Sequence, residues 1–223
     1  MADICTNFYV TTVDLNPKMD IIWSFDYSIV GPLSASAGLT TFLFKKGGNL
    51  INGGEYSSLG YGPYGSKAGI TDGVICIALD THGEFSRKKL MSTGYTTTNV
   101  LSQVMTVRNK TTTDNFNLLT NFSLSSFDIQ SVTETISYNR LKFCLTDSGN
   151  TLKIYKLDST TNDFVCIKIL NPNLDFSTTY GMLNLGFSYT SPTITGLGKA
   201  KLYIKDICVQ GTYISTLSIG ESV

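Results

Sequence analysis

The sequence has little charge and no excess of either sign. Its 223 residues include 17 lysines and arginines against 17 aspartates and glutamates, so the formal net charge at pH 7 is zero. A nucleic-acid-binding surface needs a basic patch or stripe, and we therefore expect no DNA or RNA partner. Histidine is nearly absent too, because His82 is the only one and no nucleophile-elbow motif accompanies it. This argues against catalysis by a histidine-activated serine or cysteine.

Long apolar runs are also missing. None approaches the roughly 18 residues of a membrane helix, and residues 1–5 form neither a basic nor an apolar signal segment. We expect no membrane insertion and no classical secretion. The five cysteines are odd in number and stand mostly among apolar residues. This pattern favours small buried thiols over a disulfide framework and indicates assembly in a reducing compartment.

Short segments rich in β-branched and aromatic residues fill the chain instead. Trp23, Phe25 and Tyr27 alternate with polar residues at period two, which predicts a half-buried strand with Trp23 as a core anchor. The apolar run at residues 73–79 is typical of a strand buried on both faces. Further strands are predicted at residues 8–13, 38–44, 104–108, 116–127, 141–145, 152–157, 164–169, 183–189, 200–209 and 213–219. Since no amphipathic helix of ordinary length separates them, an antiparallel sandwich or barrel is indicated.

No linker divides the chain, so we expect a single domain over residues 1–223. The segment 141–169 predicts a three-strand meander, because its strands are joined by turns of Asp, Gly and Asn, and its lysines mark the wet face. The tail, residues 210–223, contains an alternating strand. That strand either closes the domain's own sheet or contacts a partner.

A loop rich in glycine and tyrosine precedes the apolar run. Eight glycines between residues 47 and 69 leave the backbone free to take positive φ, and the tyrosines supply contact area. A loop this long in a compact domain is usually functional or disordered. We interpret one glycine and three tyrosines of the loop, with the histidine of the following turn, as a ligand-binding set: Gly54, Tyr56, Tyr61, Tyr64 and His82.

Asp80 ends the apolar run, in a position where its carboxylate must meet a cation, backbone N–H groups or water. Two interpretations stay open: Asp80 caps its own turn, or it binds a metal together with Glu84. Calcium takes about six to eight oxygen ligands, whereas the stretch 80–84 offers two side-chain carboxylates at most. We expect no cofactor, with a weak calcium site at Asp80 and Glu84 as the alternative.

Several segments, in chain order, resemble the concanavalin A-like, legume-type lectin sandwich. They correspond to the stretch before the family's first carbohydrate loop, its glycine loop, its metal-bearing strand, its back-sheet hairpin and its late Gly-Phe-Ser strand: residues 37–43, 53–60, 74–81, 141–157 and 183–188. The resemblance implies an all-β fold, an antiparallel β-sandwich of the jelly-roll type. Function has to be argued from the site, since one fold hosts many functions.

The chain departs from the family at the site. The resemblance implies a sugar-binding aspartate just before Gly38, where this chain has Ala37, and a metal-binding glutamate two residues before Asp80, where it has Ala78. We therefore expect a weakened sugar site and no manganese or zinc. Related glucanases place their nucleophile at the position of Ala78, because retaining hydrolysis uses two carboxyl groups about 5 to 5.5 Å apart. We expect no enzymatic activity, and a glycan-degrading enzyme is the least favoured alternative.

A second, looser resemblance concerns the central region. The Gly/Tyr loop running into residues 73–85, and then the Thr106-Val107-Arg108 strand, is similar to lectin-like structural modules of phages and large viruses. It implies a non-enzymatic structural or attachment protein located in a virion. Its expected partners are further copies of itself or other virion proteins, and surface glycans. The alternative is a soluble carbohydrate-binding lectin, with or without calcium, that is cytoplasmic or unconventionally exported.

Overall fold

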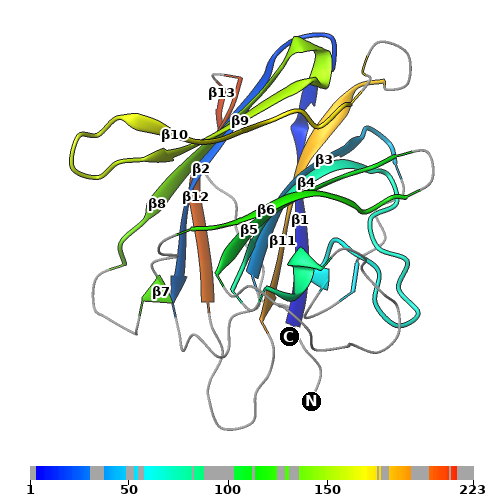
Figure 1. Ribbon diagram of the computed structural model, residues 1–223, viewed down its shortest axis with the longest axis horizontal. Helices are drawn as coiled ribbons and strands as arrows, with labels where there is room; N and C mark the ends of the chain where they lie inside the picture. Colours follow the sequence, from blue (N-terminus) through cyan, green and yellow to red (C-terminus); the bar gives the residue numbers. More distant parts are fainter. Residues whose placement is uncertain are drawn as a thin grey trace, which may run out of the picture.

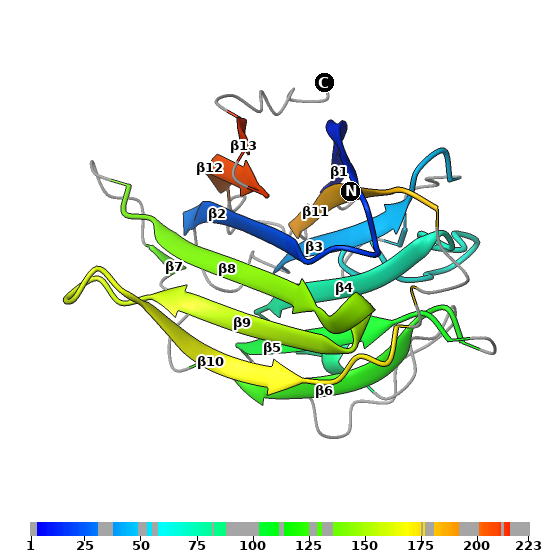
Figure 2. The same cartoon turned by 90° about the horizontal axis from the view of Figure 1, so that it is seen from above.

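Two β-sheets pack face to face (Figures 1 and 2). The computed structural model describes residues 4–30, 38–48, 53–54, 58–81, 83–87, 103–111, 114–124, 129–130, 136–174, 176, 181–191, 201–210 and 212–214. Sheet A has six strands in the order β1-β11-β3-β4-β5-β6, and sheet B has seven, ordered β10-β9-β8-β2-β12-β13 with β7 beside β2. Among the described strands, only the β2–β7 pair is parallel. The predicted antiparallel sandwich is confirmed.

The strand bounds follow the predicted segments closely. Sheet A comprises β1 (Ile4–Leu15), β11 (Leu183–Ser191), β3 (Gly38–Lys45), β4 (Gly73–Asp80), β5 (Val104–Asn109) and β6 (Asn117–Ser123). Sheet B comprises β10 (Phe164–Leu170), β9 (Thr151–Leu157), β8 (Asn139–Thr146), β2 (Ile21–Val30), β12 (Lys201–Val209), β13 (Thr212–Ile214) and β7 (Ile129–Gln130). Two three-residue helical turns lie between strands: η3 (Glu84–Ser86) follows β4, and η4 (Asp147–Gly149) connects β8 to β9. In the described part of the chain no helix is long and apolar enough to cross a membrane.

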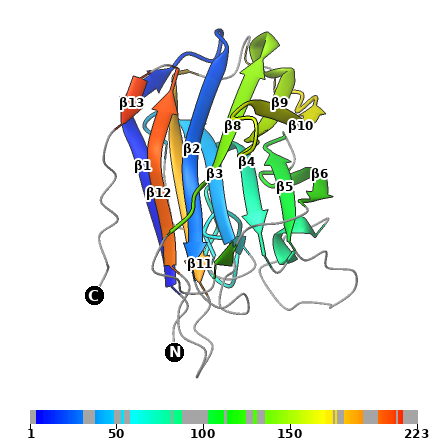
Figure 3. The same cartoon turned by 90° about the vertical axis from the view of Figure 1, so that its left-hand side faces the viewer.

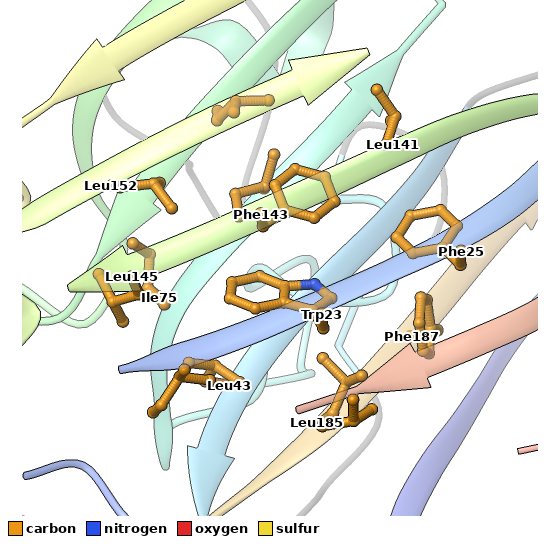
Figure 4. Close-up of a cluster of buried hydrophobic side chains, with 14 of the residues drawn as sticks. Trp23, Phe25, Leu43, Ile75, Leu141, Phe143, Leu145, Leu152, Leu185 and Phe187 are labelled. Atoms are coloured by element: carbon orange, nitrogen blue, oxygen red, sulfur yellow. The ribbon is translucent and has the colours of Figure 1, made fainter. Parts of the chain in front are cut away.

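The main core lies between the sheets, where the period-two pattern of β2 directs its apolar side chains (Figure 4). Trp23 is 0% exposed, and its ring stacks on Phe143 with centroids 5.0 Å apart. Its indole Nε1–H donates a hydrogen bond to Thr41 Oγ1 at 3.1 Å, so the one polar atom of the side chain is satisfied within the core. Trp23 is the core anchor that the sequence predicted.

The meander of β8, β9 and β10 forms one end of sheet B, as predicted. The prediction that its lysines all mark the wet face is wrong for Lys156 and Lys168, which lie on the core-facing side of sheet B. Lys142 lies outside, with its Nζ 5.1 Å from the Tyr155 ring centroid. A β-bulge after Cys166 shifts the register of β10, so that Lys168 pairs with the buried Ile154 and faces sheet A. Its Nζ lies 5.3 Å from the ring centroid of Phe122 in β6.

The C-terminal strand β13 lies at the edge of sheet B and pairs with β12, with Thr212 opposite Val209 and Ile214 opposite Ile207. Figure 3 shows β13 next to β12, with β2 and β8 following across the sheet. Of the two interpretations of the tail, closure of the domain's own sheet holds for residues 212–214. The partner-contacting role of residues 210–223 stays a prediction, since residues 215–223 lie outside the described residues.

Candidate functional site

A second core covers the face of sheet A that points away from sheet B. Along β4, Ile75 and Ile77 face the main core, while Cys76 and Ala78 face outwards into the second one. The second core consists of residues from β3 and β4, the glycine-rich loop, the turn after β4 and the segment before β6: Phe42, Phe44, Leu59, Tyr61, Ile70, Cys76, Ala78, Phe85 and Phe116. Every residue of β4 is therefore buried, as the apolar run predicted.

At Gly54 the backbone of the glycine-rich loop packs closely against another part of the same loop. The Gly54 N–H donates to Gly62 O at 2.7 Å, and its carbonyl accepts from the Gly60 N–H at 2.8 Å. A Cβ built at Gly54 would lie 1.9 Å from Tyr64 Cβ, far inside any allowed contact. The glycines of this loop therefore serve close backbone approach as well as conformational freedom.

Tyr61 and Gly54 are the members of the predicted ligand-binding set that the structure buries. Tyr61 is 0% exposed, and its ring packs 5.2 Å from Phe42 and 5.7 Å from Phe116, measured between centroids. Tyr64 lies half-buried at the surface end of the same loop, in an isolated bridge with Lys67. Its ring can contribute to a binding surface in a way that the buried ring of Tyr61 cannot.

Asp80 caps the turn that follows β4. Asp80 is only 1% exposed. Its Oδ1 accepts a hydrogen bond from the Gly83 N–H at 2.7 Å, and its Oδ2 accepts one from the Phe85 N–H at 2.6 Å. Two backbone donors supply the kind of compensation that a buried carboxylate requires. Of the two interpretations of Asp80, the geometry supports the turn cap.

Arg108 holds the other side of the same turn. Its guanidinium is fully buried and donates to Phe85 O at 3.1 and 2.7 Å, to Phe116 O at 2.5 Å and to Arg87 O, while the Phe85 ring lies 5.0 Å from Arg108 Cζ. Burial lowers the pKa of Arg108 to about 10. This value is still well above neutral pH, so the group remains protonated there. Asp80 and Arg108 thus fasten residues 83–87 to the sheet, one through N–H groups and the other through carbonyls.

Arg108 is not among the predicted site residues, and the sequence places it only within a predicted strand. A charged side chain inside an apolar strand must nevertheless find acceptors close by. The acceptors are the carbonyls of residues 85, 87 and 116. Residue 116 is near Arg108 in the chain, but residues 85 and 87 are about twenty residues away. The available signal was therefore the buried charge itself, and the partners could not be read from spacing.

The remaining predicted residues are only partly described. Ala37, Tyr56 and His82 lie outside the described residues, and Glu84 is described only as backbone within η3. Ala78 is fully buried in the second core, where the metal-binding glutamate of the lectin family would stand. In the part of the chain that the structure describes, no group of three or more His, Cys, Asp or Glu side chains is placed to hold a metal ion. The ligand-binding set and the weak calcium site stay predictions.

Comparison with known proteins identifies the architecture. No family model and no curated protein sequence matches the chain. Among solved structures, lectin I-B4 from Griffonia simplicifolia in its metal-free form superposes with a TM-score of 0.61 at 12% identity, over 96% of this chain and 81% of that one. Lectin II from Ulex europaeus gives 0.60 at 10% identity, over 91% and 80%. Lectin I from Ulex europaeus, in complex with the methyl glycoside of α-L-fucose, gives 0.53 at 15% identity, over 88% and 74%. The chain therefore has the concanavalin A-like β-sandwich fold of the legume lectins, as its sequence motifs implied.

Proposed function

We propose that this chain is a non-enzymatic structural or attachment protein of a virion, which uses a lectin-like fold for surface recognition. The observation that carries the proposal is the state of the β4 end. Asp80 is occupied in capping its own turn, and Ala78 fills an apolar cluster where a metal-binding or nucleophilic carboxylate would be needed. The end of β4 thus holds the turn that follows it. The looser resemblance of the central region to viral modules is the reason for placing the protein in a virion.

We propose that the structural role depends on self-association through sheet B. Strands β10 and β13 are the two ends of the strand order of this sheet, and an edge strand offers unpaired N–H and C=O groups to a partner. We propose that residues 210–223 dock on a neighbouring copy or another virion protein. Size-exclusion chromatography with light scattering compares the intact chain with one truncated after Ile214, which keeps β13. A smaller assembly in the truncated form supports docking by the tail, and an unchanged mass contradicts it.

The location is tested by mass spectrometry of gradient-purified virions and of matched cytosol from the source. We expect this chain among the virion proteins in constant proportion to the other structural proteins. Its presence in cytosol alone would contradict the proposal. An incubation with soluble β-glucans should release no reducing sugar, because the described β4 end presents Ala78 in place of the nucleophile.

A soluble carbohydrate-binding lectin is the second candidate. The observation that favours it is the fold, since one similar lectin was solved with the methyl glycoside of α-L-fucose and another, the winged bean acidic lectin, with methyl α-D-galactose. Glycan-array binding that EDTA abolishes would indicate a calcium-dependent lectin and would assign Asp80 and Glu84 to the metal. Binding that resists EDTA leaves Asp80 in its turn-capping role.

A further inference from the structure

A groove of about 340 Å³ lies at the free end of the β8–β9–β10 meander, away from the glycine-rich loop and the turn after β4. Its lining includes Tyr138, Asn139, Lys156, Asp158, Val165 and Ile167. Figures 1 and 2 show the turn between β9 and β10 projecting well beyond the strands of sheet A. Ligand pockets are commonly about 300 to 1,000 Å³, so the groove has room for a small ligand.

The groove arises because the core-facing side of sheet B runs out past the core. One register row crosses the sheet from Phe25 through Leu141 and Lys156 to Val165. Phe25 and Leu141 are each 1% exposed, whereas Val165 is 49% exposed. Directly paired residues of an antiparallel sheet point to the same face. Lys156 and Val165 therefore continue the inner face at a place where the core no longer covers it.

The polar groups of the groove differ in what they already bind. The Arg140 guanidinium is ion-paired with Asp26 and lies 3.8 Å from Asp206. Asp158 Oδ1 accepts a hydrogen bond from the Thr160 N–H at 2.7 Å, and a carboxylate has further acceptor sites. By contrast, the described residues give the Lys156 ammonium neither an ion pair nor a hydrogen bond.

Charge in the groove is close to balanced. Backbone N–H groups of its turn lower the pKa of Asp158, so this carboxylate is ionised at neutral pH and offsets the Lys156 ammonium. The charge of Arg140 is already offset by Asp26 and Asp206. A balanced site that offers both donors and acceptors beside an apolar strip suits an uncharged, polyhydroxylated ligand better than an anion or a cation.

We propose that this groove is a binding site for a neutral saccharide, distinct from the loops at the β4 end. The Lys156 ammonium and the Asn139 amide donate to sugar hydroxyls, and the Asp158 carboxylate accepts from them. Val165 and Ile167 contact the apolar face of the pyranose ring. The inference rests on the proposed function as a recognition protein, and it names the ligand class and the surface that recognises it.

A glycan array that carries both neutral and acidic glycans tests the site, with the intact chain and two pairs of variants. Lys156→Met removes the ammonium but keeps the stem, and Lys153→Met is its control, because Lys153 pairs with Ile169 on the opposite face of the same strand. Wild type should bind at least one neutral glycan. Lys156→Met should lose affinity roughly tenfold or more, as expected for a lost hydrogen bond from a charged donor, and Lys153→Met should match the wild type.

Val165→Arg blocks the groove with a side chain from its apolar wall, and Ile169→Arg places the same residue on the outer face of β10. The first should abolish binding and the second should leave it unchanged, with thermal unfolding showing that each variant is folded. If Val165→Arg does not fold, the Lys156 pair decides. Binding that survives the groove variants, binding confined to acidic glycans, or no binding by wild type would each overturn the inference. None of these results bears on whether the chain is found in virions, because the mass spectrometry of purified virions tests that proposal separately.

Discussion

Replacing Arg108 tests whether the turn after β4 is fastened to sheet A as the contacts indicate. We consider Arg108→Met, which keeps the apolar part of the side chain and removes the guanidinium. Three carbonyls, those of Phe85, Arg87 and Phe116, then lose their donor. A buried acceptor left without a partner costs about 1–3 kcal/mol, so the three together cost on the order of 6 kcal/mol.

Part of that cost is recovered, because the variant no longer buries a charge. The pKa of Arg108 lies at about 10 instead of 12.5, and this difference corresponds to roughly 3 kcal/mol by which burial penalises the charged form. The net loss is therefore about 3 kcal/mol. Such a loss is a large share of the roughly 5–15 kcal/mol that stabilises an ordinary domain.

Equilibrium unfolding in urea measures this loss, and the fluorescence of Trp23, the only tryptophan and a fully buried one, reports the main core. Arg140→Met is the matched control, because its ion pair with Asp26 is partly exposed and should contribute about 1 kcal/mol or less. Cys76 gives a second readout, since it pairs directly with Arg108 across β4 and β5 and is buried under the same turn. A loss below about 1 kcal/mol in Arg108→Met, with Cys76 still protected from iodoacetamide, would refute the bracing role.

Four further results are expected. Gly54→Ala should lower the unfolding midpoint clearly, by at least the roughly 1–3 kcal/mol of an overpacked site, because its Cβ would meet Tyr64; an unchanged midpoint in urea would show that the loop can move aside. Asp80→Asn should cost about 1–3 kcal/mol, since one of two backbone N–H groups loses its acceptor, and elemental analysis of the wild type should find no stoichiometric manganese or zinc. Iodoacetamide should alkylate the exposed Cys166 in the native protein, whereas Cys76, whose thiol pKa burial raises well above its ordinary value, should react only after unfolding; equal rates would contradict the burial.

The strands were predictable because their signals are local. Alternation at Trp23, Phe25 and Tyr27 requires one buried face, and turn residues at 147–150 and 158–163 fix where the meander reverses. The orientation of Lys168 was not predictable in the same way. It depends on one extra residue in β10, and an insertion of one residue turns every later side chain to the other face.

The candidate site was less predictable because its contacts join segments that are far apart in the chain. The sequence indicated that Asp80 needs partners, and the turn cap was one of the two interpretations. It could not show that Tyr61 folds back onto Phe42 and Phe116, since aromatic residues in a glycine-rich loop suit a buried cluster and a binding surface equally well. Only the packing of the loop on sheet A distinguishes these outcomes.

The second core also changes what the glycine content of the loop means for recognition. Read from the sequence, the glycines indicate a flexible loop, but a Cβ at Gly54 would meet Tyr64, and one at Gly73 would lie 2.3 Å from Tyr61 Oη. The glycines here let the loop pack closely on the second core. Tyr61 is buried in that core and anchors the loop, while Tyr64 remains near the surface. A surface held in this way loses little conformational entropy on binding, because its backbone is already ordered. Any ligand contact made by the described part of the loop would therefore come from a pre-formed surface, and substitutions at Gly54 or Tyr61 would weaken binding by loosening that surface rather than by removing a contact.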